Sequence, residues 1–288
     1  MINESQIDVQ YLDLSSEICR DLEIKVREKL ASLCKGAGFL KEDVFNILAD
    51  VSIFMQYPIE DDEICGFVCC KEGRAFSFIN SYIPYEKQLF AAAHELYHIW
   101  YDEDVLKNGE LLESDVLDPA SGVGLEEREI KANRFAALLM VPKDVLINEL
   151  DYRKVSAGDQ VSLENIVKLM SKFGMPYKTI IRRLYEIRHI DQEQCLQLLQ
   201  IPDRGEKSPI RMLQKRLQIG EEQNSRTNVI KFNGLVDKAI TAYDNQLISV
   251  DKLKYLLSIV RKQPLDFDIK IESSRLNEKE LLELLEND

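Results

Sequence analysis

Two histidines and a glutamate in the segment AAAHELYHIWY have the spacing of a metal site. His94 and His98 are four residues apart, so on a helix they share one face and both imidazoles can reach one ion. Zinc suits two such imidazoles, and it lowers the pKa of a water that it binds towards ~7. Glu95 follows the first histidine, where its carboxylate can accept that proton and pass it to a leaving amine. The pattern therefore predicts zinc-dependent hydrolysis, with Glu95 as the general base.

The third metal ligand must come from another part of the chain, because a catalytic zinc has three protein ligands and one open position. The segment GLEEREIKANRFAALLMVP, residues 124–142, offers Glu129 and Asn133, which are again four residues apart. On a helix, Glu129 can bind the metal while Asn133 accepts a hydrogen bond from the far nitrogen of a ligand histidine. We therefore predict a ligand set of His94, His98 and Glu129, supported by Asn133.

Other side chains are candidates for the third ligand. Glu126 and Glu127 lie at the start of the same predicted helix, where a carboxylate also interacts favourably with the helix dipole. His189 is the third histidine of the chain, but it lies far downstream in a basic helical stretch, where a histidine is more often a surface residue. Two histidines and a carboxylate also suit manganese or iron, although zinc is the metal that the motif favours.

A helix from about residue 86 to 101 must carry the histidine pair, with an apolar stripe that anchors it. This stripe consists of Leu89, Ala93, Leu96 and Trp100. Two strand-like runs, 65–70 and 75–79, come before the helix, and a second helix at about 125–139 follows an acidic loop at 102–124. The motif HExxH arises by chance in many sequences, but these surrounding elements favour a metal site. The predicted fold class is α+β, a mostly helical core with a small sheet, followed by a helical C-terminal region.

The sequence suggests four parts. Residues 1–145 hold the predicted metal site, and residues 146–200 contain several short helical patterns. Residues 201–228 are polar with charges of both signs, which is typical of a linker. Residues 229–288 contain further helical patterns and are predicted to form a small helical C-terminal domain.

The helical patterns within 146–200 allow two interpretations. Two of them are separated by a tight turn, and the second contains Arg182, Arg183 and Arg188, as a helix-turn-helix might. We favour a helical segment that packs on the catalytic core, because a DNA-recognition helix needs a basic face and this one is mixed.

The composition excludes several classes of protein. A net charge of -13 argues against broad nucleic-acid binding, which Lys and Arg side chains drive by neutralising phosphates. The 45% of hydrophobic residues suffices for a core and is not typical of a disordered chain. We see neither a signal peptide nor an apolar stretch approaching ~18 residues, so we expect a cytoplasmic protein that does not contact membranes. Six cysteines are scattered along the chain, and the three in CGFVCC are interpreted as buried thiols in a reducing cytosol.

Two blocks of the sequence resemble the ImmA/IrrE metallopeptidases: INSYIPYEKQLFAAAHELYHIWY and EEREIKANRFAALLMVP. The resemblance covers about residues 40–190 and implies a zinc-dependent endopeptidase with a zincin-like core. It implies that His94 and His98 are ligands, that Glu95 is the general base and that Glu129 is the third ligand. Members of the family often belong to mobile elements or to stress and DNA-damage responses, and they cut a helix-turn-helix repressor to release its target genes.

The sequence departs from the family pattern at two positions. Tyr97 replaces the small residue, usually Gly, that follows Leu in many members, and it either crowds the cleft or packs outward. Lys131 stands where many members have a second acidic residue, which favours Glu129 as the ligand. The tail is also not recognisable as the GAF domain that some larger members contain.

The function predicted is regulatory proteolysis of one partner, a helix-turn-helix transcriptional repressor. The alternative is a non-cleaving metal-binding regulatory or sensor module, or a toxin–antitoxin component, that acts by binding a partner protein. The intact Glu95 favours the enzyme, because a scaffold has no need of a base. The donor that stabilises the oxyanion is not assigned by the sequence; its candidates are Tyr82, Tyr85, Tyr97, Tyr101 and His189.

Overall fold

The computed structural model describes residues 14–33, 38–107, 112–114 and 127–269. The chain forms two compact units, Met1–Lys231 and Phe232–Asp288. Glu126, most of the predicted acidic loop and the predicted last helix at 277–288 lie outside the described residues.

The chain contains a small mixed sheet in the strand order β4-β2-β3-β1-β5, and the boundary between the two units falls within β5. Its strands are β1 (Ile53–Tyr57), β2 (Gly66–Lys71), β3 (Arg74–Asn80), β4 (Leu112–Ser114) and the two-residue β5 (Lys231–Phe232). Strand β2 is antiparallel to both β3 and β4, whereas β1 is parallel to β3. Glu72 and Gly73 join β2 to β3 with positive φ angles of 54° and 73°, as a tight hairpin turn requires. The two predicted strands are therefore β2 and β3, while β1 was not predicted from the sequence.

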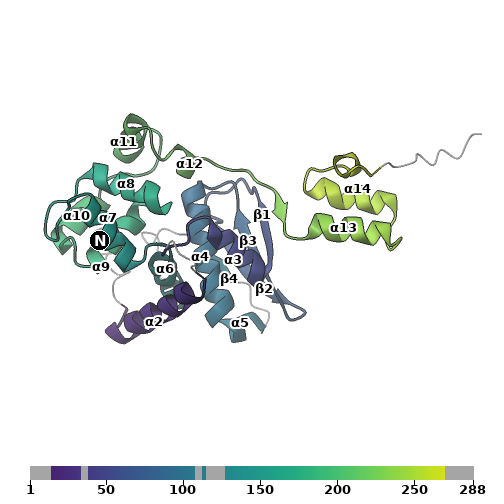
Figure 1. The fold of residues 1–288 in the computed structure, drawn as a ribbon, viewed down its shortest axis with the longest axis horizontal. Helices are drawn as coiled ribbons and strands as arrows, with labels where there is room; N and C mark the ends of the chain where they lie inside the picture. Colours follow the sequence, from purple (N-terminus) through teal and green to yellow (C-terminus); the bar gives the residue numbers. More distant parts are fainter. Residues whose placement is uncertain (1–13, 34–37, 108–111, 115–126, 270–288) are drawn as a thin grey trace, which may run out of the picture. The chain divides into compact units, whose positions relative to one another are not determined.

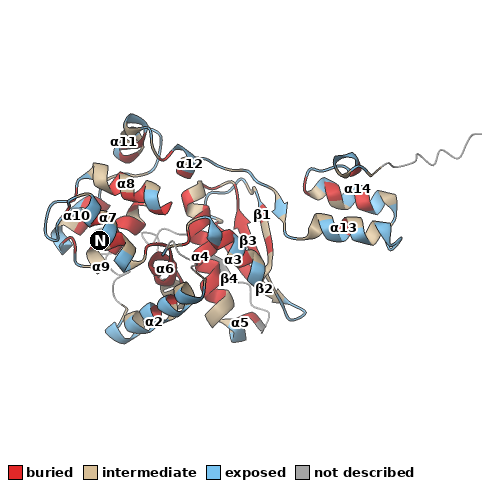
Figure 2. Cartoon of the chain, viewed as in Figure 1, coloured by how far each residue is buried: buried red, intermediate tan, exposed pale blue. Residues whose placement is uncertain are grey.

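Helix α4 (Tyr85–Tyr101) lies between this sheet and helix α6 (Glu127–Met140), as Figure 1 shows. Nearly every side chain from Glu86 to His98 is buried, so α4 is covered on all sides (Figure 2). Three further helices complete this part of the unit: α2 (Ser16–Leu33), α3 (Asp43–Val51) and α5 (Glu103–Lys107). The predicted α+β class is confirmed, with the motif helix at the centre of the core.

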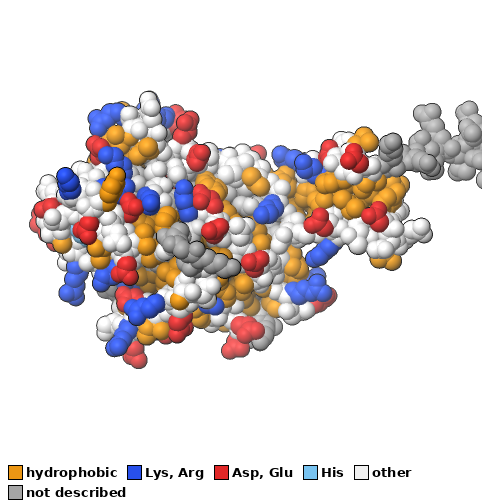
Figure 3. Space-filling view, viewed as in Figure 1, with side chains coloured by type: hydrophobic (Ala, Val, Ile, Leu, Met, Phe, Trp, Pro, Cys, Tyr) orange, Lys and Arg blue, Asp and Glu red, His pale blue; other side chains and the backbone are white. Residues whose placement is uncertain are grey.

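The helical segment after α6 shares the hydrophobic core of the first unit. It consists of α7 (Lys143–Tyr152), α8 (Leu163–Phe173), α9 (Tyr177–Glu186) and α10 (Gln192–Leu199). Arg182 and Arg183 on α9 are only 5% and 2% exposed, so they do not form a basic face for DNA. On the face that Figure 3 shows, acidic and basic side chains are interspersed over this unit.

Residues 201–228, which the sequence predicts to be a linker, instead contain helices α11 (Pro209–Leu217) and α12 (Glu221–Asn224). Ile210 is buried in the main core, and Leu213 and Leu217 pack against it. These apolar side chains recur at helical spacing, but they alternate with charged residues. The high share of charge therefore made the segment resemble a polar linker. The segment belongs to the first compact unit, so the linker prediction is corrected here.

The C-terminal unit is a helical hairpin of α13 (Leu235–Asp244) and α14 (Val250–Ile259), followed by the 3-10 turn η3 (Pro264–Phe267). Its small core consists of Ala239, Leu253 and Leu257 with partly buried neighbours. Hydrophobic side chains gather over this hairpin in Figure 3. None of the described helices is both long and apolar enough to cross a membrane.

A buried charge network holds the C-terminal end of α6. Glu186 pairs with Arg134 at 2.5 Å and with Arg183, and all three side chains are buried. Arg183 also donates a hydrogen bond from Nε to the carbonyl oxygen of Val141, 3.0 Å away, just after the end of α6. The network therefore ties α9 to the helix that carries the predicted third ligand.

We expect Glu186→Ala to destabilise the fold by about 3–5 kcal/mol, because it leaves two buried guanidinium groups without their carboxylate. Urea unfolding measures the change. The matched control is Glu164→Ala, which removes an exposed i,i+4 pair with Lys168 and should change the free energy of unfolding far less. Similar losses in both variants would contradict a structural role for the buried network.

Candidate metal centre

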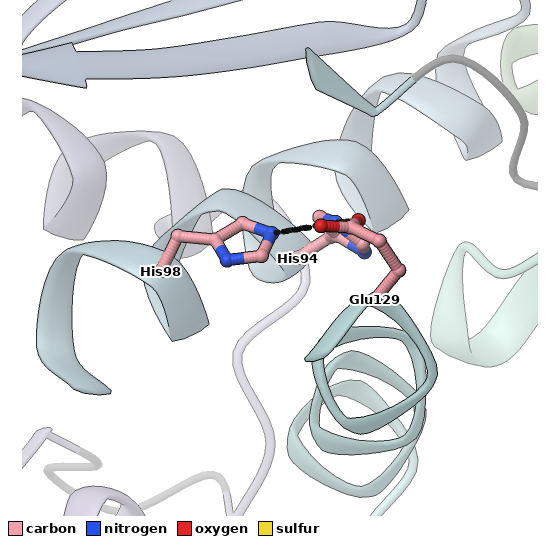
Figure 4. Close-up of side chains that lie close together, drawn as sticks. All are labelled: His94, His98 and Glu129. Carbon is pink, nitrogen blue, oxygen red and sulfur yellow. Dashed lines mark hydrogen bonds and ion pairs between the residues drawn. The ribbon is translucent and has the colours of Figure 1, made fainter. Parts of the chain in front are cut away.

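His94 and His98 project from adjacent turns of α4, and both are only 1% exposed. Their Nε2 atoms are 3.0 Å apart. Glu129 comes from α6 and places Oε2 3.1 Å from His94 Nε2 and Oε1 3.6 Å from His98 Nε2 (Figure 4). Within the described part of the chain, these three residues form the one group with metal-ligand geometry, and their ligand atoms lie within 4.8 Å of one another.

The donor set fits a metal ion. Two ligands that are each ~2.0–2.1 Å from a tetrahedral zinc are roughly 3.3 Å apart, close to the separations seen here. Two imidazoles and one carboxylate from two helices also leave a coordination position open. The group could therefore hold a catalytic metal.

The far nitrogen of each imidazole has its own acceptor. Nδ1 of His94 is 2.9 Å from Oδ1 of Asn133, which is the contact that the sequence predicted. Nδ1 of His98 is 2.7 Å from Oδ2 of Asp102. When each Nδ1 donates its proton to these oxygens, each Nε2 presents its lone pair to the space beside Glu129.

Asp102 is the site residue that sequence reasoning missed. It lies four residues after His98 and forms the C-cap of α4, where its backbone N–H donates to the carbonyl oxygen of His98. The sequence assigned it to an acidic loop of many carboxylates. The available signal was its i+4 spacing from His98, the same spacing that links the two histidines.

The charges of the site shift two pKa values in opposite directions. Burial alone would lower the pKa of His98, but hydrogen bonds to the carboxylates of Asp102 and Glu129 outweigh it and raise this pKa to about 9. Burial alone would raise the pKa of Glu129, but its hydrogen bonds with His94 and His98 bring it well below the usual range. Without metal, the site therefore favours a charged imidazole beside a carboxylate.

Glu95 is fully buried on the sheet side of α4. A Cβ atom built on Gly66 of β2 would lie 3.1 Å from its Oε1 and 2.8 Å from the carbonyl oxygen of Phe78. The absence of a side chain at Gly66 thus leaves room for the carboxylate against the sheet. The charge of Glu95 also helps to raise the pKa of His98, so Glu95 lies near the metal ligands.

The structure separates the other ligand candidates from this group. Glu127 is on the same helix as Glu129, but its side chain is 63% exposed and pairs with Lys131 at 2.6 Å. His189 is buried between α9 and α10, outside the group, and burial lowers its pKa. Glu126 lies outside the described residues.

Tyr97 belongs to a cluster of aromatic rings that includes the ligand His98, whose ring centroid is 5.8 Å away. The side chain of Tyr97 is buried between α4 and α6, with ring centroids 5.5 Å from Phe135 and 5.5 Å from Tyr101. The tyrosine therefore fills the interface between these two helices. The guanidinium of Arg226 lies over the ring of Tyr82, with its Cζ atom 4.1 Å from the ring centroid.

A His-His-Glu group on two helices beside a small mixed sheet, with both histidines buried and the glutamate partly buried, is typical of a metallopeptidase-type domain. Residues 67–185 match the family model Peptidase_M78, described as the IrrE N-terminal-like domain. The match confirms the resemblance of this part of the chain to the ImmA/IrrE metallopeptidases. His94, Glu95, His98, Asp102, Glu129 and Asn133 all lie inside the matched range, whereas His189 lies outside it. No curated protein matches the chain.

We expect Glu129→Ala to abolish stoichiometric metal binding, because it removes one of three ligands from a buried site. Metal content after dialysis measures the effect. Glu127→Ala is the matched control, two residues away on the same helix, and should retain full metal content. Normal metal content in Glu129→Ala would show that another residue is the third ligand.

Metal binding at pH 7.5 should release about one proton, because His98 is protonated in the metal-free protein below its pKa of about 9 and a ligand imidazole must be neutral. Affinity should therefore rise with pH up to about 9 and then level off. Because folding raises the pKa of His98, its interactions also stabilise the metal-free fold. This stabilisation is complete at a pH below about 6.5, the pKa of an unfolded histidine, and it is lost as the pH rises through 9. Calorimetric titrations in two buffers with different ionisation enthalpies count the protons. A count of zero would contradict the charged state of His98.

Proposed function

We propose that the chain is a zinc-dependent endopeptidase that hydrolyses a peptide bond in a regulatory protein, a helix-turn-helix transcriptional repressor. The observation that carries this proposal is the position of Glu95, a buried carboxylate on the same helix as His94 and His98. A group that only binds metal has no need of a further, buried carboxylate beside its ligands at that position. The match to a metallopeptidase family supports the same chemistry.

Each residue of the site has a distinct role in this proposal. His94, His98 and Glu129 would hold the zinc ion. When bound, zinc supplies a Lewis acid that polarises the substrate carbonyl and activates water for attack. Glu95 accepts a proton from the attacking water and delivers it to the leaving amine. Asn133 and Asp102 keep the two imidazoles in the tautomer that directs Nε2 towards the metal position.

The choice of substrate rests on the family resemblance. ImmA/IrrE peptidases act on helix-turn-helix repressors, so we propose such a repressor as the partner of this chain. The role would then be transcription regulation in the cytoplasm, as part of a stress response or a mobile element. The buried Arg182 and Arg183 support a protein partner over direct binding of DNA.

We expect Glu95→Gln to retain zinc and to lose cleavage of a co-expressed helix-turn-helix repressor, by about 10²–10⁴-fold. A helix-turn-helix repressor encoded by a neighbouring gene would be the first candidate. Intact mass measurement of the repressor gives the cleavage position, and bound zinc is measured in the same samples.

The control for this experiment is Asp104→Asn, an exposed carboxylate on α5, which should cleave normally. Cleavage that persists in Glu95→Gln would contradict the assigned base. A wild-type protein that binds zinc and the repressor without cutting it would instead support the non-cleaving regulatory module.

A further inference from the structure

The segment 225–229, which we call the strap, lies against the turn at residues 81–84, which precedes α4. It follows α12 and leads into β5 (Figure 1). The strap lies outside the residues that match the peptidase family. Two backbone hydrogen bonds of 3.0 Å join it to the turn, one from Tyr85 N to Ser225 O and one from Asn228 N to Ser81 O.

The first of these bonds caps the motif helix. The first four N–H groups of a helix have no partner within the helix, and an N-cap side chain bonds only to that of the second or third residue. The N-cap of α4 is Pro84, which makes no side-chain cap. The carbonyl oxygen of Ser225 accepts from Tyr85 N, the first N–H group of the helix, which has no partner within α4. The strap therefore supplies a cap that the local sequence of α4 lacks.

Side chains of the strap reinforce this contact. Arg226 donates to the carbonyl oxygen of Tyr82 at 3.0 Å and to Asp62 at 3.0 Å, and its hydrogen bond holds the pKa of Asp62 below the usual value. Thr227 Oγ1 is 3.2 Å from Oε1 of Gln88, a fully buried residue of α4. The exposed Arg226–Asp62 pair alone contributes little, but the strap contacts the turn at several points at once.

The side chain of Asn80 holds this turn through hydrogen bonds to the backbone. This buried side chain accepts from the backbone N–H groups of Ile59 and Tyr82 and donates to the carbonyl oxygens of Ile59, Asp61 and Ile64. Gln88 donates from α4 to the carbonyl oxygens of Ser81 and Ile83. The start of α4 is thus held by the sheet on one side and by the strap on the other.

The position of this helix start bears on the metal site. Tyr85 is nine residues before His94, about 13–14 Å along a straight helix. Both histidines and Glu95 are on α4, whereas Glu129 is on α6. A shift of α4 along its axis would therefore move two ligands and the base relative to the third ligand.

We infer that the strap is a positioning element of the metal site, which sets the register of α4 against α6 by capping the motif helix. The inference rests on the proposed function. It extends the functional unit beyond residue 185, where the family match ends, to the end of the first compact unit.

The test is the double variant Arg226→Gln/Thr227→Val in the full chain, with Arg216→Gln, an exposed arginine on α11, as the control. Amide exchange of Tyr85 should accelerate about tenfold. The dissociation constant for zinc, measured by chelator competition, should rise by about 3- to 30-fold. The control should change neither quantity by more than about twofold. Arg226→Lys with Thr227 intact should restore most of the zinc affinity.

Two results would overturn the inference: unchanged exchange of Tyr85, or faster exchange with unchanged zinc affinity, since the strap would then hold only the turn. If the double variant does not fold, Thr227→Val alone is judged by the same two measurements. A wild-type protein that binds no zinc would contradict the proposed function, and that result is obtained before any strap variant is made.

Discussion

The structure depends on one constraint: two imidazoles and a carboxylate meet inside the core, where each polar atom needs a partner. The Nε2 atoms of His94 and His98 are 3.0 Å apart and face Glu129, an arrangement that an ion between them would stabilise. Their Nδ1 atoms are satisfied by Asn133 and Asp102. The helices must hold all of these groups in register, and that demand explains why α4 is covered on every side.

The two helices meet this demand through different neighbours. Helix α6 is tied at its C-terminal end by Arg183, which bonds the carbonyl oxygen of Val141 and pairs with buried Glu186. Helix α4 is held at its start by the Asn80 turn and by the strap. Ligands on separate helices are thus held by separate parts of the chain: α9 contacts the end of α6, whereas Asn80 and the strap contact the start of α4.

Much of this site could be predicted from the sequence because its residues repeat at helical spacing. The spacing of His94 and His98, and of Glu129 and Asn133, gave the group and the contact between Asn133 and His94. Asp102 obeys the same spacing, but it lies at the helix end among other acidic residues. The strap was not predicted, because Ser225 and Tyr85 are far apart in sequence and join through backbone atoms that carry no residue pattern. Helix α11 was not predicted either, because its many charged residues gave an amphipathic segment the composition of a linker.

The central claim is that His94, His98 and Glu129 hold the metal of a peptidase. X-ray absorption at the zinc edge of the purified full chain tests it most directly. The account predicts one zinc with only nitrogen and oxygen neighbours at ~2.0–2.2 Å, two of them with the outer-shell scattering of imidazole. Sulfur neighbours at ~2.3 Å would place the metal on cysteines instead and would contradict the account.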